Sequence, residues 1–292
     1  PYAKLAADSI GSNHHPLEIG QNDFIDSFEE VLDALEEPHA DPAAMPLYHL
    51  TKLIKNTGIK TVLSGEGSDE LFLGYDNYAK FLRYYEFANS LNSNQNEFLN
   101  GIISALQNNT KESEYLRRIV KKQNLYNSFG EVFTDIQKKK LFKKVPTYKL
   151  EKAKQDPVDW MSYIDLKIWL GQSLLSKVDR ISMANSLEVR TPFLDFNLVD
   201  YVFSIKSDIK VGNTNKHLLK KIASKYIPEE IINRTKKGFN SPFNEWIMEE
   251  YGNSILDLIL EVNKETNMFN IEYIKHIFDL ATKNKFKQHL WS

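Results

Sequence analysis

The residue types best suited to chemistry lie together between Ser64 and Glu70, in the sequence Ser-Gly-Glu-Gly-Ser-Asp-Glu. Two glycines let a ligand approach the backbone closely. Three acids, Glu66, Asp69 and Glu70, share the same short stretch. Because acids repel a bare phosphate, their presence indicates a metal ion, a nucleophile that needs a base, or a hydroxyl in the ligand set.

The neighbouring residues predict the elements that position these side chains. Thr61, Val62 and Leu63 form a short apolar, β-rich run that predicts the end of a buried strand. A turn follows, and a helix is predicted from Asp69 to Leu73 with Ser68 as its cap. Ligands of open α/β sheets bind at the carboxyl ends of strands, and helix N-termini offer free N–H groups to anions. The structural alternative is a tight strand-to-helix turn whose acids face the helix dipole.

Known phosphate-binding patterns do not explain this segment. The dinucleotide fingerprint needs a third glycine that is absent here. The Gly-x-x-x-x-Gly-Lys-Ser/Thr pattern is absent from the whole sequence.

Two further segments combine charge with unusual patterning. Charged residues alternate with apolar ones between Leu174 and Asp195, and buried charges require partners. An internal ion-pair network is one explanation, and direct contact with a substrate is the other. The second segment, Arg234-Thr235-Lys236-Lys237-Gly238-Phe239, is a basic stretch that ends in a glycine. A lysine there is a mobile point charge suited to phosphate, although an exposed basic turn would have the same composition.

Together the three segments resemble the synthetase domain of the glutamine-hydrolysing asparagine synthetases, in the order in which that family carries them. The resemblance extends from about Tyr2 to about Trp246. It implies an α/β fold: a partly truncated parallel sheet of the adenine-nucleotide alpha-hydrolase type, flanked by helices, with a predominantly helical C-terminal half. Residues 1–292 would then form one N-terminally truncated ligase domain, with residues 76–170 as a helical layer within it.

The resemblance also implies roles for individual residues. Glu66 matches the family's general base, and Lys236 matches its catalytic lysine beside the leaving pyrophosphate. Asp69 would hold Mg²⁺ and pyrophosphate. The expected nucleotide contacts are Ser64, Gly65, Gly67, Asp69, Arg234 and Arg190.

Members of this family use ATP and Mg²⁺ to adenylate a carboxylate, which ammonia from glutamine then converts to an amide. The acceptor implied here is the aspartate side chain, so that the products are asparagine, AMP and pyrophosphate. Two alternatives stay open: another carboxylate acceptor such as a sugar acid, and a non-catalytic remnant that binds nucleotide. A homodimer is a further expectation.

Two features of the family are missing from the sequence. There is no cysteine to serve as the glutaminase nucleophile, and no Ser-Gly-Gly-x-Asp-Ser loop. We therefore expect a fragment that lacks the glutaminase domain and the first nucleotide loop, and that is inactive by itself. In the family the glutaminase domain belongs to the same polypeptide.

Composition narrows the class of protein. A net charge of −2 gives no reason to expect nucleic acid or an anionic membrane as a partner. No apolar run approaches the ~20 residues that span a bilayer, and a cytoplasmic location is expected. The seven histidines are scattered, without metal-ligand spacing.

Hydrophobic periodicity predicts most of the remaining elements. Helices are expected over 2–10, from about Phe24 to Leu35, from Pro46 to about Ile54, and over 172–186, 196–205, 216–226 and 243–261. A short strand is expected over 16–19, and loops are expected over 92–96 and 143–157.

Overall fold

The computed structural model describes residues 2–105, 110–146, 150, 156–234 and 242–283. The chain forms two compact units. Unit 1 comprises Pro1–Tyr78 and Ser162–Ser241, and unit 2 comprises Ala79–Met161 and Pro242–Ser292. Each unit is therefore assembled from two segments that are distant in the sequence.

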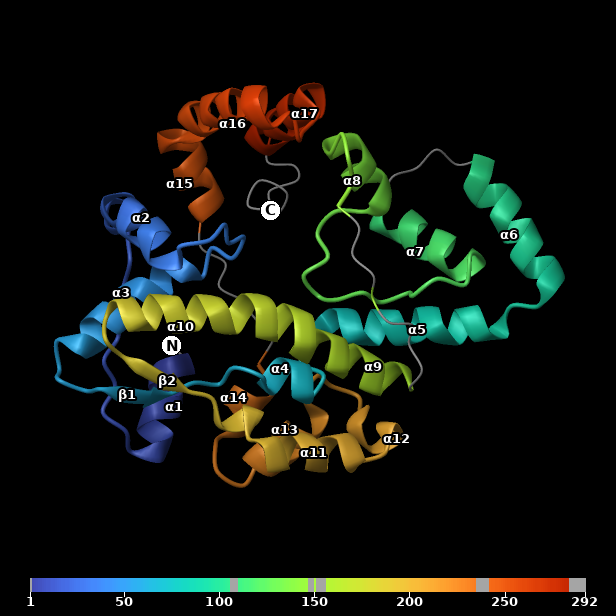
Figure 1. The fold of residues 1–292 in the computed structure, drawn as a ribbon. Coiled ribbons are helices and arrows are strands. Elements are labelled where there is room, and N and C mark those ends of the chain that lie inside the picture. The colour runs from blue at the N-terminus through green and yellow to red at the C-terminus, as the bar shows by residue number, and fades with distance from the viewer. Residues whose placement is uncertain (1, 106–109, 147–149, 151–155, 235–241, 284–292) are drawn as a thin grey trace. The chain divides into compact units, whose positions relative to one another are not determined.

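Unit 1 contains both strands and the helices around them (Figure 1). Its elements are α1 (Tyr2–Ile10), α2 (Gln21–Leu35), α3 (Ala44–Lys55), β1 (Thr61–Leu63), α4 (Ser68–Leu71), a π-helical segment (Asp165–Leu174), α10 (Leu175–Ala184), β2 (Glu188–Arg190), a 3₁₀ turn (Pro192–Leu194), α11 (Phe196–Ser204), α12 (Ser207–Lys210), α13 (His217–Ala223) and α14 (Glu229–Ile232). Two helices cross the boundary between the units: α5 (Asp76–Ser90) and α9 (Pro157–Ile164).

The sheet consists of two parallel strands in the described part of the chain. Thr61 pairs with Glu188, Val62 with Val189 and Leu63 with Arg190. Parallel sheets are normally covered on both faces, whereas Leu63 is 74% exposed here. The parallel pairing agrees with the expected α/β class, in a molecule that is mostly helical. The specific alpha-hydrolase type of sheet stays a prediction.

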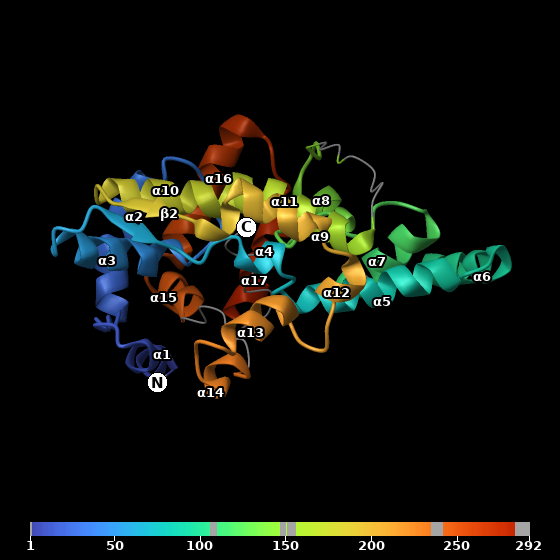
Figure 2. The same cartoon turned by 90° about the horizontal axis from the view of Figure 1, so that it is seen from below.

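Helix packing holds the strands and the loop after β1 in place. Figure 1 shows α10 alongside α2 and α3, and α10 also packs against β2 and the π-helical segment. In the turned view of Figure 2, α4 lies near α11 and α13. The apolar side of α4 contributes to a core cluster with Leu71, Phe72 and Val202 at its centre. The loop between β1 and α4 is thus held between a strand and an apolar core.

The described residues of unit 2 form helices joined by irregular segments, with an isolated bridge between Phe142 and Phe269. Besides parts of α5 and α9 it contains α6 (Ser93–Ala105), α7 (Lys111–Val120), α8 (Asp135–Leu141), α15 (Phe243–Glu250), α16 (Gly252–Thr266) and α17 (Ile271–Thr282). A core cluster of Leu141, Ile274 and Ile277 joins α8 to α17.

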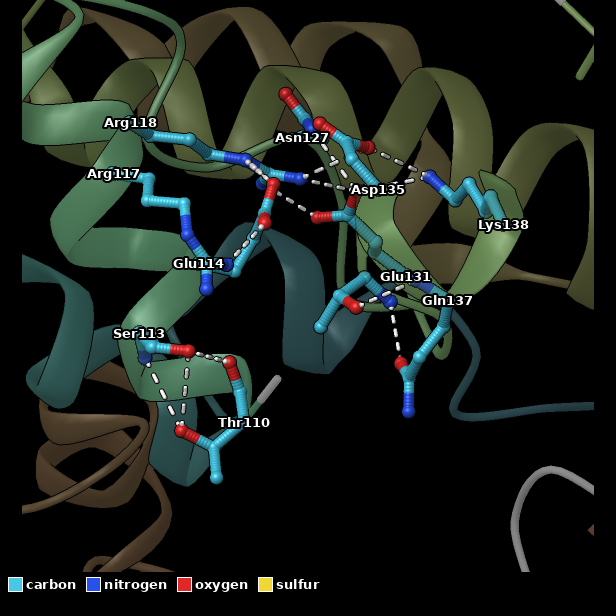
Figure 3. A network of polar contacts seen from close by, with 11 residues as sticks. Thr110, Ser113, Glu114, Arg117, Arg118, Asn127, Glu131, Asp135, Gln137 and Lys138 are labelled. Atoms are coloured by element: carbon cyan, nitrogen blue, oxygen red, sulfur yellow. Dashed lines mark hydrogen bonds and ion pairs between the residues drawn. The ribbon is translucent and has the colours of Figure 1, made fainter. Parts of the chain in front are cut away.

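A buried charge network links α7, α8 and the segment between them in unit 2 (Figure 3). Arg118 of α7 is 2% exposed, and each of its terminal nitrogens donates to an oxygen of Glu131 at 2.7 Å. Glu114 and Asp135 complete the set around the guanidinium, at 3.4 and 3.7 Å. Burial alone would raise the pKa of Glu131, but its bonds to Arg118 and the charges of Arg118 and Lys138 hold that pKa below its usual value.

Several expectations from the sequence were wrong. The described residues 16–19 form no strand, and Leu17 is exposed. Residues 93–96 belong to α6, so the segment 92–96 is not a loop. The helix predicted over 69–73 is the single turn α4, and its cap is Gly67 rather than Ser68. Leu73 takes a left-handed conformation, with a φ of 57°, which ends that turn early.

Other expectations were confirmed. The structure contains the helix over 2–10, the helix from Phe24 to Leu35 and the strand over 61–63. Most of the helix over 172–186 is present as α10, although residues 172–174 belong to the π-helical segment and α10 ends at Ala184. The assignment of residues 1–292 to one ligase domain, with 76–170 as a layer of it, stays a prediction. Among the described residues, no helix combines the length and apolar character needed to cross a membrane.

Candidate active site

The loop from Ser64 to Asp69 is fixed at its strand end by the sheet. Ser64 N–H donates to the carbonyl of Arg190 at 2.8 Å, which extends the β1–β2 ladder by one bond. Ser64 Oγ then accepts the N–H of Glu66 at 3.3 Å. These two bonds hold the start of the loop at the carboxyl end of β1, where ligands of α/β sheets bind.

Two glycines allow the close packing on which the loop depends. Gly67 has a φ of 87°, and a Cβ there would lie 2.3 Å from Leu194 Cδ2. A Cβ on Gly74 would lie 1.9 Å from Asp69 Oδ1 and 2.5 Å from Lys216 Cε. The second glycine therefore makes room for a meeting of the Asp69 and Lys216 side chains.

Lys216 brings a cation to the acidic loop from 147 positions along the chain. Its Nζ donates to Ser68 Oγ at 2.8 Å and lies 3.2 Å from Asp69 Oδ2. Lys216 itself has a left-handed backbone, with a φ of 54°, and its N–H donates to the carbonyl of Leu73 at 3.3 Å. Strained non-glycine residues of this kind occur preferentially at functional sites.

Lys216 was not predicted as a site residue, because it lies in none of the three segments that carried the family resemblance. Its left-handed backbone and its contacts with the loop become visible only in the folded chain.

Glu66 is half-buried among charges of both signs. Burial raises the pKa of the Glu66 carboxyl, and the Lys177 ammonium opposes that rise more than any other charge. Asp41 and Asp69 also raise this pKa, while Lys216 lowers it. A carboxylate whose pKa is moved upward is a better proton acceptor near neutral pH than an ordinary glutamate.

Glu70, which had no assigned role, is 1% exposed. Burial raises the pKa of Glu70 to about 7, even though a hydrogen bond from Tyr75 acts in the opposite direction. Tyr75 Oη donates to Glu70 Oε1 at 2.6 Å and accepts from Trp169 Nε1 at 3.2 Å. Glu70 thus belongs to the buried support of the loop, on the side of the π-helical segment.

The remaining predicted site residues lie in different surroundings. The Arg190 side chain is 66% exposed and pairs with Glu188 at 3.0 Å, while its carbonyl binds Ser64. The Arg234 guanidinium lies 5.7 Å from the centre of the Tyr2 ring. Lys236 lies outside the described residues. Roles for these three side chains at a phosphate stay predictions.

The charged residues between Leu174 and Asp195 are paired mainly with a segment near residue 40. Lys177 Nζ bonds to Asp41 Oδ2 at 2.5 Å, and Arg180 pairs with Glu37 at 3.0 Å. These ion pairs support the network explanation for the charged segment. The acidic partners, however, come mostly from outside the segment.

Asp69 is the carboxylate of the loop that was predicted to hold a metal. Among the described residues, no group of three or more His, Cys, Asp or Glu side chains could hold a metal ion. Mg²⁺ in phosphate-transfer sites is commonly held by one or two carboxylates together with substrate phosphates. Asp69, with a hydroxyl and an ammonium beside it, fits that manner of binding.

Comparison with known proteins shows the family to which this chain belongs. The asparagine synthase family matches residues 1–292, which is the whole chain. The chain therefore belongs to the asparagine synthase family.

Individual relatives carry related names. Asparagine synthetase [glutamine-hydrolyzing] 1 of Bacillus subtilis (strain 168) is 29% identical over 304 residues, covering 99% of this chain and 48% of the relative. A putative asparagine synthetase [glutamine-hydrolyzing] of Mycobacterium tuberculosis (strain ATCC 25618 / H37Rv) is 31% identical, covering 84% and 39%. The protein named amidase chry2 of Gibberella zeae is 24% identical, covering 90% and 44%. The chain thus spans about half the length of these relatives, or less.

Proposed function

We propose that the complete protein containing this chain converts a carboxylate to an amide in two steps that depend on ATP. In the first step the carboxylate attacks the α-phosphorus of ATP, which forms an acyl-adenylate and releases pyrophosphate. In the second step ammonia attacks the acyl carbon, which gives the amide and AMP. The preferred acceptor is the aspartate side chain, so that the product is asparagine.

The observation that carries this proposal is the set of opposite charges around the loop at the carboxyl end of β1. Lys216 Nζ lies 2.8 Å from Ser68 Oγ and 3.2 Å from Asp69 Oδ2. Glu66 lies among the charges of Lys177, Asp41 and Asp69. The first group suits a polyphosphate with its metal, and the second suits a proton acceptor.

The adenylation step spreads negative charge over the α-phosphate and the leaving pyrophosphate, so cations must be in place. We assign Lys216 to this role together with Lys236, whose assignment rests on the family resemblance. Asp69 would hold Mg²⁺, which supplies counter-charge to the phosphates when bound. Ser64, Gly65 and Gly67 would offer backbone groups to the nucleotide. Arg234 and Arg190 would contribute further positive charge to its binding.

The amide-forming step requires a base, because the attacking nitrogen must lose a proton. We assign Glu66 to this role. Its raised pKa supports the assignment, since a weakly basic glutamate would accept a proton less readily at neutral pH.

The nitrogen source, assembly and location are also proposals. Relatives named glutamine-hydrolyzing are about twice as long as this chain, and a glutaminase region in the additional length would supply ammonia. A homodimer and a cytoplasmic location belong to the same proposal. The alternative is an acceptor other than aspartate, and the relative named an amidase is the reason to consider it. This alternative is not better supported than aspartate.

The test uses the complete protein with ATP, Mg²⁺, ammonia and a panel of carboxylates, and measures AMP and amide separately. We expect both products in equal amounts with aspartate, and little of either with acceptors of other shapes. Equal amounts of AMP and amide with another acid, and not with aspartate, would show that the alternative acceptor is the substrate. Neither product with any acid would indicate the non-catalytic remnant.

A further inference from the structure

Lys216 reaches Asp69 from a loop whose backbone is tied to the turn after α4. The Lys216 N–H donates to the carbonyl of Leu73 at 3.3 Å, and the two residues have left-handed backbone, with φ of 54° and 57°. The preceding residue, Asn215, donates its side-chain amide to Asp76 Oδ1 at the start of α5. The Lys216 side chain therefore begins at a defined point beside the acidic loop.

The Lys216 ammonium contacts two polar groups at the start of α4. Its Nζ donates to Ser68 Oγ at 2.8 Å and lies 3.2 Å from Asp69 Oδ2. An ammonium carries three N–H donors, so these two contacts leave one for a further acceptor. The side chains of Lys216 and Asp69 are 24% and 27% exposed, so a ligand can approach the pair from solvent.

The Asp69 carboxylate has little room for a second cation beside this ammonium. Its other oxygen packs near Gly74, where a Cβ would lie 1.9 Å from Oδ1. A metal bound to Oδ2 at about 2.1 Å would lie within about 5.3 Å of Lys216 Nζ. Two cations at that separation repel each other, and salt screens them little over so short a distance.

A polyphosphate would remove this conflict. Mg²⁺ in phosphate-transfer sites is held by one or two carboxylates together with substrate phosphates, whose negative charge balances more than one cation. A lysine ammonium is a point charge on a flexible stem of four carbons. The Lys216 ammonium can therefore move from Asp69 to a phosphate oxygen while its backbone keeps the bond to Leu73.

We propose that Lys216 is a displaceable counter-ion of Asp69: its ammonium excludes free metal from the carboxylate before nucleotide binds, and yields the carboxylate to the metal that arrives with a polyphosphate. This inference rests on the proposed function in one respect, the assignment of Asp69 to the metal. It adds that the metal enters together with the nucleotide and not ahead of it, and that Lys216 sets this order.

The measurement compares binding of Mn²⁺ alone and of Mn²⁺–ATP to the complete protein, with no acceptor carboxylate and no ammonia present. Mn²⁺ shares the preference of Mg²⁺ for oxygen ligands, and its free concentration is measured by electron paramagnetic resonance. Calorimetry gives the affinity for Mn²⁺–ATP. Lys216→Met should bind Mn²⁺ alone on the order of tenfold more tightly, because the competing charge is gone. The same variant should bind Mn²⁺–ATP severalfold more weakly, because a cation beside the phosphates is lost.

Two further variants connect these changes to the charge on Lys216 and to Asp69. Lys221→Met is the matched control, because Lys221 lies exposed on α13, and it should change neither affinity. In the double variant Lys216→Met/Asp69→Asn, the gain in affinity for Mn²⁺ alone should disappear. If Lys216→Met does not fold, Lys216→Gln carries the same predictions, since its amide can still donate to Ser68 Oγ.

Opposite changes in the two affinities would support the counter-ion, because damage to the loop would weaken both. An unchanged or lower affinity for Mn²⁺ alone in the Lys216 variants overturns it, even in a protein that makes amide. A gain that persists in the double variant also overturns it, because the metal would then lie elsewhere. An affinity for Mn²⁺–ATP that rises as much as that for Mn²⁺ alone would show that the ammonium does not yield to phosphate.

The proposed function fails or stands separately from this inference. If Lys216→Met gains affinity for Mn²⁺ through Asp69 and loses affinity for Mn²⁺–ATP, but the unchanged protein forms no amide from any acid, the counter-ion stands and the proposed function is overturned.

Discussion

At the scale of single residues, Lys216 is the side chain that most clearly links a distant part of the chain to the acidic loop. Lys216→Met in the complete protein should lower pyrophosphate–ATP exchange about 100-fold, because it removes a cation beside the leaving group. Lys216→Arg should retain part of the rate. Lys221→Met is the matched control, since Lys221 lies exposed on α13, the helix that begins directly after Lys216. Equal rates in Lys216→Met and Lys221→Met would show that Lys216 only stabilises the loop.

Glu70 should make the stability of the protein depend on pH. Its pKa is about 7 in the folded chain against 4.5 as the ordinary value, so the folded state retains a proton that the unfolded state loses. The free energy of unfolding therefore falls as pH rises from about 4.5 to about 7, by on the order of 3 kcal/mol for this group.

Glu70→Gln removes that dependence while keeping an acceptor for Tyr75. Relative to the unchanged protein, the variant should gain stability by a few kcal/mol between pH 5 and pH 8. Urea unfolding at both pH values provides the comparison. A constant difference between the two proteins would mean that Glu70 titrates normally.

At the scale of elements, the turn from β1 to α4 depends on a glycine with left-handed backbone. Gly67→Ala should lower the free energy of unfolding by about 1–3 kcal/mol, because the new Cβ would both strain the backbone and collide with Leu194. Gly65→Ala is the matched control, since a Cβ at Gly65 meets nothing within 4 Å. Its effect should stay within about 0.5 kcal/mol. Equal losses would contradict the packing of Leu194 on the turn.

The charge network of α7 provides a second test at this scale. Arg118→Ala should cost about 3–5 kcal/mol of stability, because it leaves Glu131 buried without its main partner. Arg117→Ala should cost less than Arg118→Ala, because Glu114, the buried partner of Arg117, keeps its contact with Arg118. Thermal and urea unfolding would measure both. Similar costs for the two arginines would show that the guanidinium of Arg118 is not essential to the network.

Elements with strong local patterns were predictable, and those set by distant partners were not. The apolar run of Thr61 to Leu63 and the following glycines placed the loop correctly at the end of a strand. Asn92 and Gln95 favoured a loop by composition, but they bond to each other's backbone N–H groups and start α6. Polar residues that suggest a loop can equally cap a helix.

The acidic residues of the site were predictable from the sequence, but their cationic neighbours were not. Glu66 and Asp69 lie in one recognisable segment, whereas their cationic neighbours Lys177 and Lys216 come from parts of the chain more than 100 positions away. Nothing in local periodicity links those positions. The burial of Glu70 was equally hidden, because it depends on Tyr75 and on the π-helical segment that carries Trp169.

At the scale of the whole molecule, we propose that a single loop serves two successive chemical steps. Substitution of Asp69 and substitution of Glu66 should then impair different steps of the reaction. In the complete protein, Asp69→Asn should slow adenylation and make the rate depend strongly on the concentration of Mg²⁺. Glu66→Gln should still form acyl-adenylate while losing its capture by ammonia.

The most direct measurement follows pyrophosphate–ATP exchange and amide formation separately in Glu66→Gln, with aspartate and ammonia present. We predict that exchange persists in this variant while amide formation falls about 100-fold or more. Asp69→Asn should lose both together. If exchange and amide formation fall equally in Glu66→Gln, and both variants respond to Mg²⁺ in the same way, the division of roles within the loop is contradicted.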